Sequence, residues 1–193
     1  MRMLELCGAM VVAATEADDR ALVELARLIG FGNIESASFT DPQVALRPVV
    51  FFLVHVSMPH SAKRSLLDQL RKSGTDRLRY APAIILTPDG PAETVLHHID
   101  LGFDDVIIVP ERRDVLTGRL SKQLTSPPSY IRTSEYLGPD RRRMEKPGDP
   151  GDPRREGGNP FSRLTIRRDP LIGNMVFRRE IFGGASPMDV VRV

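Results

Sequence analysis

His55 is the residue of this chain whose type and position most strongly suggest chemistry. It follows an uninterrupted apolar run, residues 49–54, and is followed by Ser57 and Met58-Pro59. A histidine at the end of a buried strand can act as a general base or accept a phosphoryl group, provided that a carboxylate orients its ring and nearby charges stabilise the product. Thr87 ends another apolar run, but the sequence offers no acidic residue near this group.

The other chemically versatile residues do not suggest a metal site. His60, His97 and His98 lack the spacing of a recognisable ligand set, and we expect His97-His98 to lie on the solvent side of a helix. A single cysteine excludes an internal disulfide. The sequence also contains no glycine-rich phosphate loop, so we expect neither a metal nor an organic cofactor.

The elements that would position these side chains alternate regularly over residues 1–124. Buried or half-buried strands are predicted at residues 9–14, 33–39, 49–54, 83–86 and 105–109. Helices are predicted at 18–28, 41–46, 62–72, 91–101 and 113–124. This alternation predicts an α/β fold with a doubly wound, five-stranded parallel sheet. Right-handed crossovers place the functional crevice of such a sheet at the carboxyl ends of its strands.

The remainder of the chain differs in composition. Residues 125–193 contain 13 Lys+Arg against 9 Asp+Glu, nine prolines and eight glycines, whereas the whole chain has a formal net charge of only +2. We expect a largely irregular C-terminal extension: a Pro/Gly/charge-rich linker at 125–160 and an apolar-basic segment at 161–193. Residues 169–174 suit the turn of a hairpin, which would need a surface on which to dock. No apolar run reaches the ~20 residues of a membrane span, so a cytoplasmic location is expected.

The most distinctive part of this extension is residues 136–143, which resemble a Y-x-G-P-D-R-R-R segment that follows signalling domains in various bacterial regulatory proteins. Arginine guanidinium groups are forked donors for carboxylates and phosphates. One hypothesis is a docking element for an acidic surface, on this chain or on a partner, made of Tyr136, Asp140, Arg141, Arg142 and Arg143. A solubilising charge run is the simpler alternative, and nucleic-acid binding is a third.

Residues 9–124 resemble the receiver domain of bacterial response regulators, which has the CheY-like variant of the flavodoxin-like fold. The segment from His55 to Pro59 matches D-x-x-M-P except at its first position. Thr87 stands where receivers keep a Thr or Ser that hydrogen-bonds the phosphoryl group. Residues 101–105 are similar to the A-G-A-D-D segment before the fifth strand, and Val109-Pro110 stands in place of Lys-Pro.

The departures from the receiver pattern fall on its reactive residues. The resemblance places the magnesium-binding acidic pair at Ala13 and Ala14, the phospho-acceptor at His55, the lysine at Val109 and the switch aromatic at Val106. Asp18 and Asp19 are nearby in sequence but are predicted to lie inside the first helix. Magnesium requires carboxylate oxygens and a phosphoryl group requires a cation, so this degenerate pocket, which keeps Thr87, should not be phosphorylated.

The resemblance therefore implies a pseudo-receiver: a protein–protein interaction module or adaptor in bacterial two-component (phosphorelay) signal transduction, without enzymatic activity. A signalling partner or a second copy would bind the face formed by the fourth helix, fifth strand and fifth helix, residues 91–124. Two alternatives remain. One is a nucleic-acid-binding regulator that uses the arginine-rich extension, and the other is a flavodoxin-like enzyme that uses His55.

Overall fold

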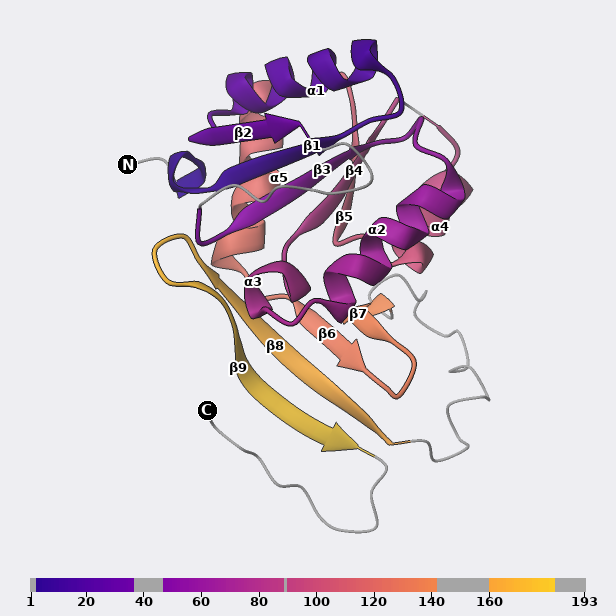
Figure 1. Cartoon of the computed structure of the whole chain (residues 1–193), viewed down its shortest axis with the longest axis vertical. Helices are drawn as coiled ribbons and strands as arrows, with labels where there is room; N and C mark the ends of the chain where they lie inside the picture. Colours follow the sequence, from indigo (N-terminus) through magenta and orange to yellow (C-terminus); the bar gives the residue numbers. More distant parts are fainter. Residues whose placement is uncertain (1–2, 37–46, 89, 142–159, 183–193) are drawn as a thin grey trace.

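The computed structural model describes residues 3–36, 47–88, 90–141 and 160–182, which form two sheets (Figure 1). The larger sheet has five parallel strands in the order β2-β1-β3-β4-β5. This order is that of the flavodoxin-like fold and confirms the predicted fold class. The strands are β1 Gly8–Val12, β2 Asn33–Ser36, β3 Val50–His55, β4 Ala83–Thr87 and β5 Asp105–Ile108.

Helices cover both faces of this sheet, as a doubly wound fold requires. Apolar side chains of α1 (Glu16–Ile29) and α5 (Arg113–Thr125) pack on one face, and those of α2 (His60–Lys72) and α4 (Ala92–Leu101) pack on the other. The central strands are apolar up to the polar residues His55 and Thr87 at the ends of β3 and β4, because both of their faces are buried. A 3₁₀ helix at Met3–Leu6 precedes β1, and the short α3 at Asp76–Arg79 lies in the connection between α2 and β4.

The start of α1 differs from the prediction by two residues. Thr15 is the N-cap, and its hydroxyl accepts a hydrogen bond from the backbone N–H of Asp18 at 3.2 Å. Asp18 therefore lies in the first turn of the helix. The helix ends at Gly30, whose φ of +101° favours glycine. The short helix predicted at 41–46 lies outside the described residues.

The second sheet corrects the expectation of a largely irregular extension. It has four antiparallel strands in the order β7-β6-β8-β9: β6 Ser129–Arg132, β7 Leu137–Pro139, β8 Phe161–Asp169 and β9 Gly173–Phe182. The hairpin predicted around residues 169–174 is confirmed. The prediction of a linker at 125–160 is wrong where β6 and β7 form. These strands have only four and three residues, and β7 contains Gly138 and Pro139. Such short strands carry little periodic signal, and they form here by pairing through β6 with the longer β8.

This second sheet packs against the amino ends of the parallel strands (Figure 1). Tyr130 and Tyr80 meet edge to face with ring centroids 5.9 Å apart, and Leu164 and Ile166 of β8 complete the same buried cluster. The side-chain amide of Asn174 donates to the carbonyl of Arg77 at 2.8 Å. The hairpin therefore has the docking surface that its marginal stability requires. In the described part of the chain, no helix is long and apolar enough to cross a membrane.

Candidate functional site

The residues predicted to form the degenerate pocket do meet at one edge of the parallel sheet. Ala13 and Ala14 follow β1, His55 ends β3 and Thr87 ends β4, while Val109 follows β5. The parallel register places Val12 beside Val54 and His55 beside Leu86, so these ends are level. The N–H of Val109 donates to the carbonyl of Thr87 at 2.8 Å.

His55 is held by a neighbouring hydroxyl and a carboxylate. Its Nδ1 lies 2.7 Å from Ser57 Oγ and 3.3 Å from Asp18 Oδ2. The Ser57 hydroxyl donates to Asp18 Oδ2 at 2.7 Å. The backbone N–H of Ser57 also donates to Nδ1 of His55, at 3.3 Å, so both polar groups of Ser57 and the Asp18 carboxylate converge on one ring nitrogen. The three side chains therefore satisfy one another.

The position of Asp18 corrects the expectation that no acid lies near His55. Asp18 stands in the first turn of α1, and its carboxylate reaches Ser57 and His55 at the end of β3. Hydrogen bonds from Ser57 and Thr15, followed by the charge of His55, lower the pKa of Asp18 from its ordinary value. Thr15 as a capping residue was the sequence signal that could have located it.

This cluster does not have the geometry of a nucleophilic triad. In such a triad the imidazole contacts the hydroxyl through one ring nitrogen and the carboxylate through the other, so that a proton can pass through the ring. Here Ser57 and Asp18 both contact Nδ1 of His55. The arrangement orients the imidazole but provides no relay to the Ser57 hydroxyl.

The pocket does not fit the magnesium ion that the receiver resemblance implies. It offers one carboxylate, Asp18, and that carboxylate is already occupied by Ser57. Ala13 and Ala14 supply no side-chain oxygen. Among the described residues, no group of three or more His, Cys, Asp or Glu side chains is arranged to hold a metal ion.

The other pocket positions are closed by local contacts. The hydroxyl of Thr87 donates to the carbonyl of Pro88 at 3.1 Å, and Thr87 is buried. Val109 packs against the core shared with α1 and α5, and the Val109-Pro110 peptide is cis. Val106, which was predicted to take the switch position, is buried under α2 and α4. None of these three side chains brings a charge to the edge.

The three remaining histidines form a cluster between α2 and α4 that sequence reasoning missed. His97 Nε2 lies 3.3 Å from His60 Nδ1. His98 is buried rather than exposed as predicted: its Nδ1 lies 2.7 Å from the carbonyl of Thr94, and its Nε2 lies 3.4 Å from Lys63 Nζ. The Thr94 carbonyl can only accept and the Lys63 ammonium can only donate, so Nδ1 carries the proton and Nε2 accepts from Lys63, which is the neutral form of the imidazole.

Residues 136–141 of the tail motif are folded against the parallel-sheet domain. The Arg141 guanidinium lies 4.2 Å from the centroid of the Tyr136 ring and donates to its hydroxyl at 3.1 Å. A Cβ on Gly138 would lie 2.7 Å from Cζ of Tyr136, so glycine is required for the ring to fold back. A Cβ on Gly102, which ends α4, would touch both side chains. The backbone N–H of Asp140 donates to the carbonyl of Ser129. Arg142 and Arg143 lie outside the described residues.

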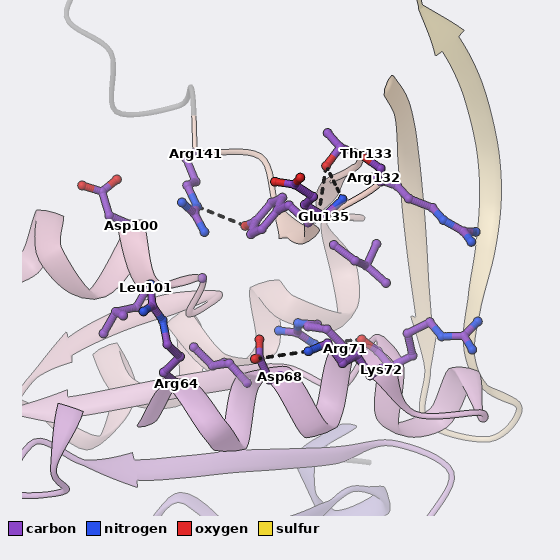
Figure 2. Close-up of a pocket in the computed structure, with 16 residues that line it drawn as sticks. Arg64, Asp68, Arg71, Lys72, Asp100, Leu101, Arg132, Thr133, Glu135 and Arg141 are labelled. Atoms are coloured by element: carbon purple, nitrogen blue, oxygen red, sulfur yellow. Dashed lines mark hydrogen bonds and ion pairs between the residues drawn. The ribbon is translucent and has the colours of Figure 1, made fainter. Parts of the chain in front are cut away.

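Beside this motif, a cleft of about 530 Å³ separates α2 from the β6–β7 connection (Figure 2). Its charged lining residues are Arg64, Arg71, Lys72, Arg79, Arg132 and Arg141, with Asp68, Asp100 and Glu135. Several of these cations are already paired: Lys72 with Asp68, Arg79 with Asp76 and Arg71 with Asp104. Much of the positive charge is therefore neutralised within the protein.

The most deeply buried charges lie at the amino edge, where Asp104 joins the two sheets. Its Oδ1 accepts from Arg168 at 2.6 Å and from the Tyr130 hydroxyl at 2.7 Å. Its Oδ2 accepts from Arg71 at 2.8 Å and from the backbone N–H of Ala83 at 2.9 Å. Burial alone would raise the pKa of Asp104, but the charges of Arg168 and Arg71 outweigh it and hold the pKa below its ordinary value.

Arg168, on β8, is the charged residue of the second sheet that binds Asp104. Its remaining donors bind the carbonyl of Tyr80 at 3.0 Å and the side-chain oxygen of Gln123 at 2.6 Å. The Arg168 side chain is completely buried, and every nitrogen of its guanidinium is bonded. Sequence reasoning did not single out Arg168, because its 64-residue separation from Asp104 leaves no local signal.

Comparison with known proteins returns structural similarities alone. No protein-family model and no curated protein matches the chain. It is similar to full-length FixJ from B. japonicum, with 21% identity over 60% of this chain and 56% of that one, and a TM-score of 0.46. The chain thus spans a little over half the length of that protein.

Two further solved structures are similar over a comparable share of this chain. For chemotaxis protein CheY4 of Vibrio cholerae, the identity is 16% over 61% of this chain and 98% of that one, with a TM-score of 0.46. For a response regulator in red light signaling of R. palustris, it is 17% over 58% and 87%, with a TM-score of 0.42. The flavodoxin-like assignment rests on the strand order and register of this chain itself.

Proposed function

We propose that this chain is a non-phosphorylatable, receiver-like module that acts through protein–protein contact, as an adaptor in bacterial two-component signalling. The observation that carries the proposal is the closed set formed by His55, Ser57 and Asp18 at the carboxyl edge. An imidazole occupies the acceptor position, its partners are already bonded to one another, and Val109 stands where a cation would be needed. Regulation would then come from partner binding rather than from a phosphoryl group.

The face formed by α4, β5 and α5 is the proposed partner surface. Each of these elements exposes one large apolar side chain: Leu96, 42% exposed, on α4; Ile108, 37%, on β5; and Val115, 37%, on α5. β5 is also an edge strand of the parallel sheet. Exposed apolar residues beside an unpaired strand edge are suited to contact with another protein.

Catalysis by His55 is the second candidate function, because Asp18 supplies a nearby carboxylate that was not expected from the sequence. The shared contact of Ser57 and Asp18 with Nδ1 argues against nucleophilic catalysis by Ser57. We therefore propose that the chain is not an enzyme and uses no cofactor.

Point variants of the full chain test the adaptor proposal. Affinity-tagged wild type, the double variant Leu96→Glu/Val115→Glu and the single variant His55→Ala would be used to capture partners from native bacterial lysate, with and without nuclease. Leu28→Glu is the matched control, since Leu28 is 54% exposed on α1, which is not one of the three elements of the proposed face.

A histidine kinase or another signalling protein should be retained by wild type, His55→Ala and Leu28→Glu, and lost with Leu96→Glu/Val115→Glu. Loss of all captured protein on nuclease treatment would instead support nucleic-acid binding by the arginine-rich segment. A turnover that disappears in His55→Ala would support the enzyme. Removal of residues 125–193 is a poor test, because deleting Arg168 leaves Asp104 buried without its closest cation.

A further inference from the structure

The β8–β9 hairpin exposes more large apolar surface than any other part of the described chain. Leu171 and Ile172 at its turn are 73% and 71% exposed, and Phe177 and Ile181 of β9 are 55% and 43% exposed. The second half of β9 extends past the parallel-sheet domain (Figure 1). Phe177 and Ile181 belong to this projecting half, whereas Leu171 and Ile172 lie at the turn that precedes β9.

β9 also has an unpaired backbone edge. It is the last strand in the order β7-β6-β8-β9, so within the described residues only β8 pairs with it. The strand is ten residues long and contains no proline. A long edge strand of this kind is a template for pairing with another strand, because a row of its N–H and C=O groups has no partner.

The residues along this edge are self-complementary. Residues 177–181 read Phe-Arg-Arg-Glu-Ile. β9 has a β-bulge at Phe177, because Arg178 pairs with Thr165 and Val176 pairs with Ile166, so the strand is regular from Arg178 onward. If a second copy pairs antiparallel about Arg179, each Arg178 lies opposite Glu180 of the second copy, and Ile181 lies next to the bulged Phe177. Opposite charges directly across an antiparallel ladder stabilise it.

Neighbouring registers lose this match. Pairing about Glu180 places two carboxylates opposite each other and Arg179 opposite Ile181, whereas pairing about Arg178 leaves Glu180 without an arginine opposite it. In the register about Arg179, the one like-charge pair is Arg179 with itself. Its guanidinium reaches across its own sheet to the Ser162 hydroxyl, at 3.4 Å, and so lies away from the edge.

From this pattern we propose that β9 is a self-association edge through which two copies form one continuous antiparallel sheet. The inference goes beyond the adaptor function and does not depend on it. In such a dimer the α4–β5–α5 face of each copy stays open, since it belongs to the other sheet. Two presented faces would strengthen binding to a partner with two matching sites without any new contact.

Complementary charge reversals test the proposal with purified full-length protein. Arg178→Glu gives a chain with two acids at positions 178 and 180, and Glu180→Arg gives a chain with two arginines there. Sedimentation velocity over a dilution series should show a wild-type dimer that weakens about tenfold or more in each single variant, because both attractive pairs become repulsive. Mixed in equal amounts, the two variants should form a heterodimer, and the double variant Arg178→Glu/Glu180→Arg should dimerise like wild type.

Arg167→Glu is the control, because Arg167 is an exposed arginine of β8 that lies away from the β9 edge. Recovery of the dimer in the mixture shows that each variant is folded, although both lose the intrachain contact of Arg178 with Glu180 at 2.8 Å. A wild-type protein that is monomeric throughout the dilution series overturns the proposal, as does a dimer whose dissociation constant is unchanged in both single variants.

Discussion

The two edges of the parallel sheet differ in how they hold charge. At the carboxyl edge, His55 and Asp18 are partly open to solvent, with side chains 22% and 28% exposed. At the amino edge, the side chains of Arg168 and Asp104 are 0% and 2% exposed and bind Tyr130, Arg71 and Gln123 as well as each other. The chain thus places its strongest electrostatic interactions where they fix the second sheet, not where a receiver would perform chemistry.

The two edges should therefore contribute unequally to the stability of the folded protein. A buried charge that loses its partner is left desolvated and uncompensated, which is among the costliest defects in a folded protein. A half-exposed hydrogen-bonded group that loses its partner can bind water instead. The amino edge should therefore determine stability, and substitutions at the carboxyl edge should be tolerated.

The largest expected effect is that of Arg168→Met. Removing this guanidinium leaves the Asp104 carboxylate buried with one fewer cation, and the free energy of unfolding should fall by about 3–5 kcal/mol in urea titrations. Arg167→Met is the matched control, since the neighbouring arginine is 53% exposed, and it should change stability by less than about 0.5 kcal/mol. Equal effects of the two variants would show that the buried network does not hold the sheets together.

A smaller effect is expected from pH, through His98 at the α2–α4 contact. Burial, and then the nearby charges of Lys63, His97 and His60, lower the pKa of His98 from its ordinary 6.5. His98 therefore binds a proton more readily in the unfolded chain than in the folded protein. Its contribution to stability is complete above pH 6.5 and is lost as the pH falls through the lower pKa of the folded state. Urea titrations between pH 7.5 and about 5 should show stability decreasing, and His98→Gln should flatten the slope. A slope unchanged in His98→Gln would assign the effect to other groups.

The smallest stability change should be at the carboxyl edge itself. His55→Ala removes the hydrogen bond to Ser57, and because water can replace it, the free energy of unfolding should fall by about 1 kcal/mol or less. Hydrogen exchange of β8 and β9 should be unaffected, whereas Arg168→Met should accelerate it. If His55→Ala destabilised the protein as much as Arg168→Met, the contrast between the two edges would be wrong.

The sequence allowed the parallel-sheet domain to be predicted because its signals are local. Apolar runs such as residues 49–54 and helical patterns such as 62–72 each reflect burial of one element against its neighbours. The hairpin around residues 169–174 was predictable for the same reason, since a turn lies between two strand-forming segments. His55, Thr87 and Val109 were placed at one edge because parallel strands end together.

What could not be predicted depends on long-range contacts or on short strands. Asp18 was rightly predicted to lie inside the first helix, but this position does not keep it from the pocket, since its carboxylate binds Ser57, 39 residues further on. The second sheet was missed because β6 and β7 are short. No sequence signal distinguishes Arg168 from the other arginines of residues 125–193, and only the fold brings it to Asp104.

The most direct test of the central claim is phosphorylation of the carboxyl edge. Wild type and His55→Asp would be incubated with Mg²⁺ and acetyl phosphate, beside a phosphorylatable receiver domain, and followed by intact mass spectrometry at neutral pH. Neither chain should gain a phosphoryl group, because restoring an acceptor at residue 55 does not supply the acidic pair at Ala13 and Ala14 or a cation at Val109. A phosphorylated species in either sample would contradict the account and show that this edge retains receiver chemistry.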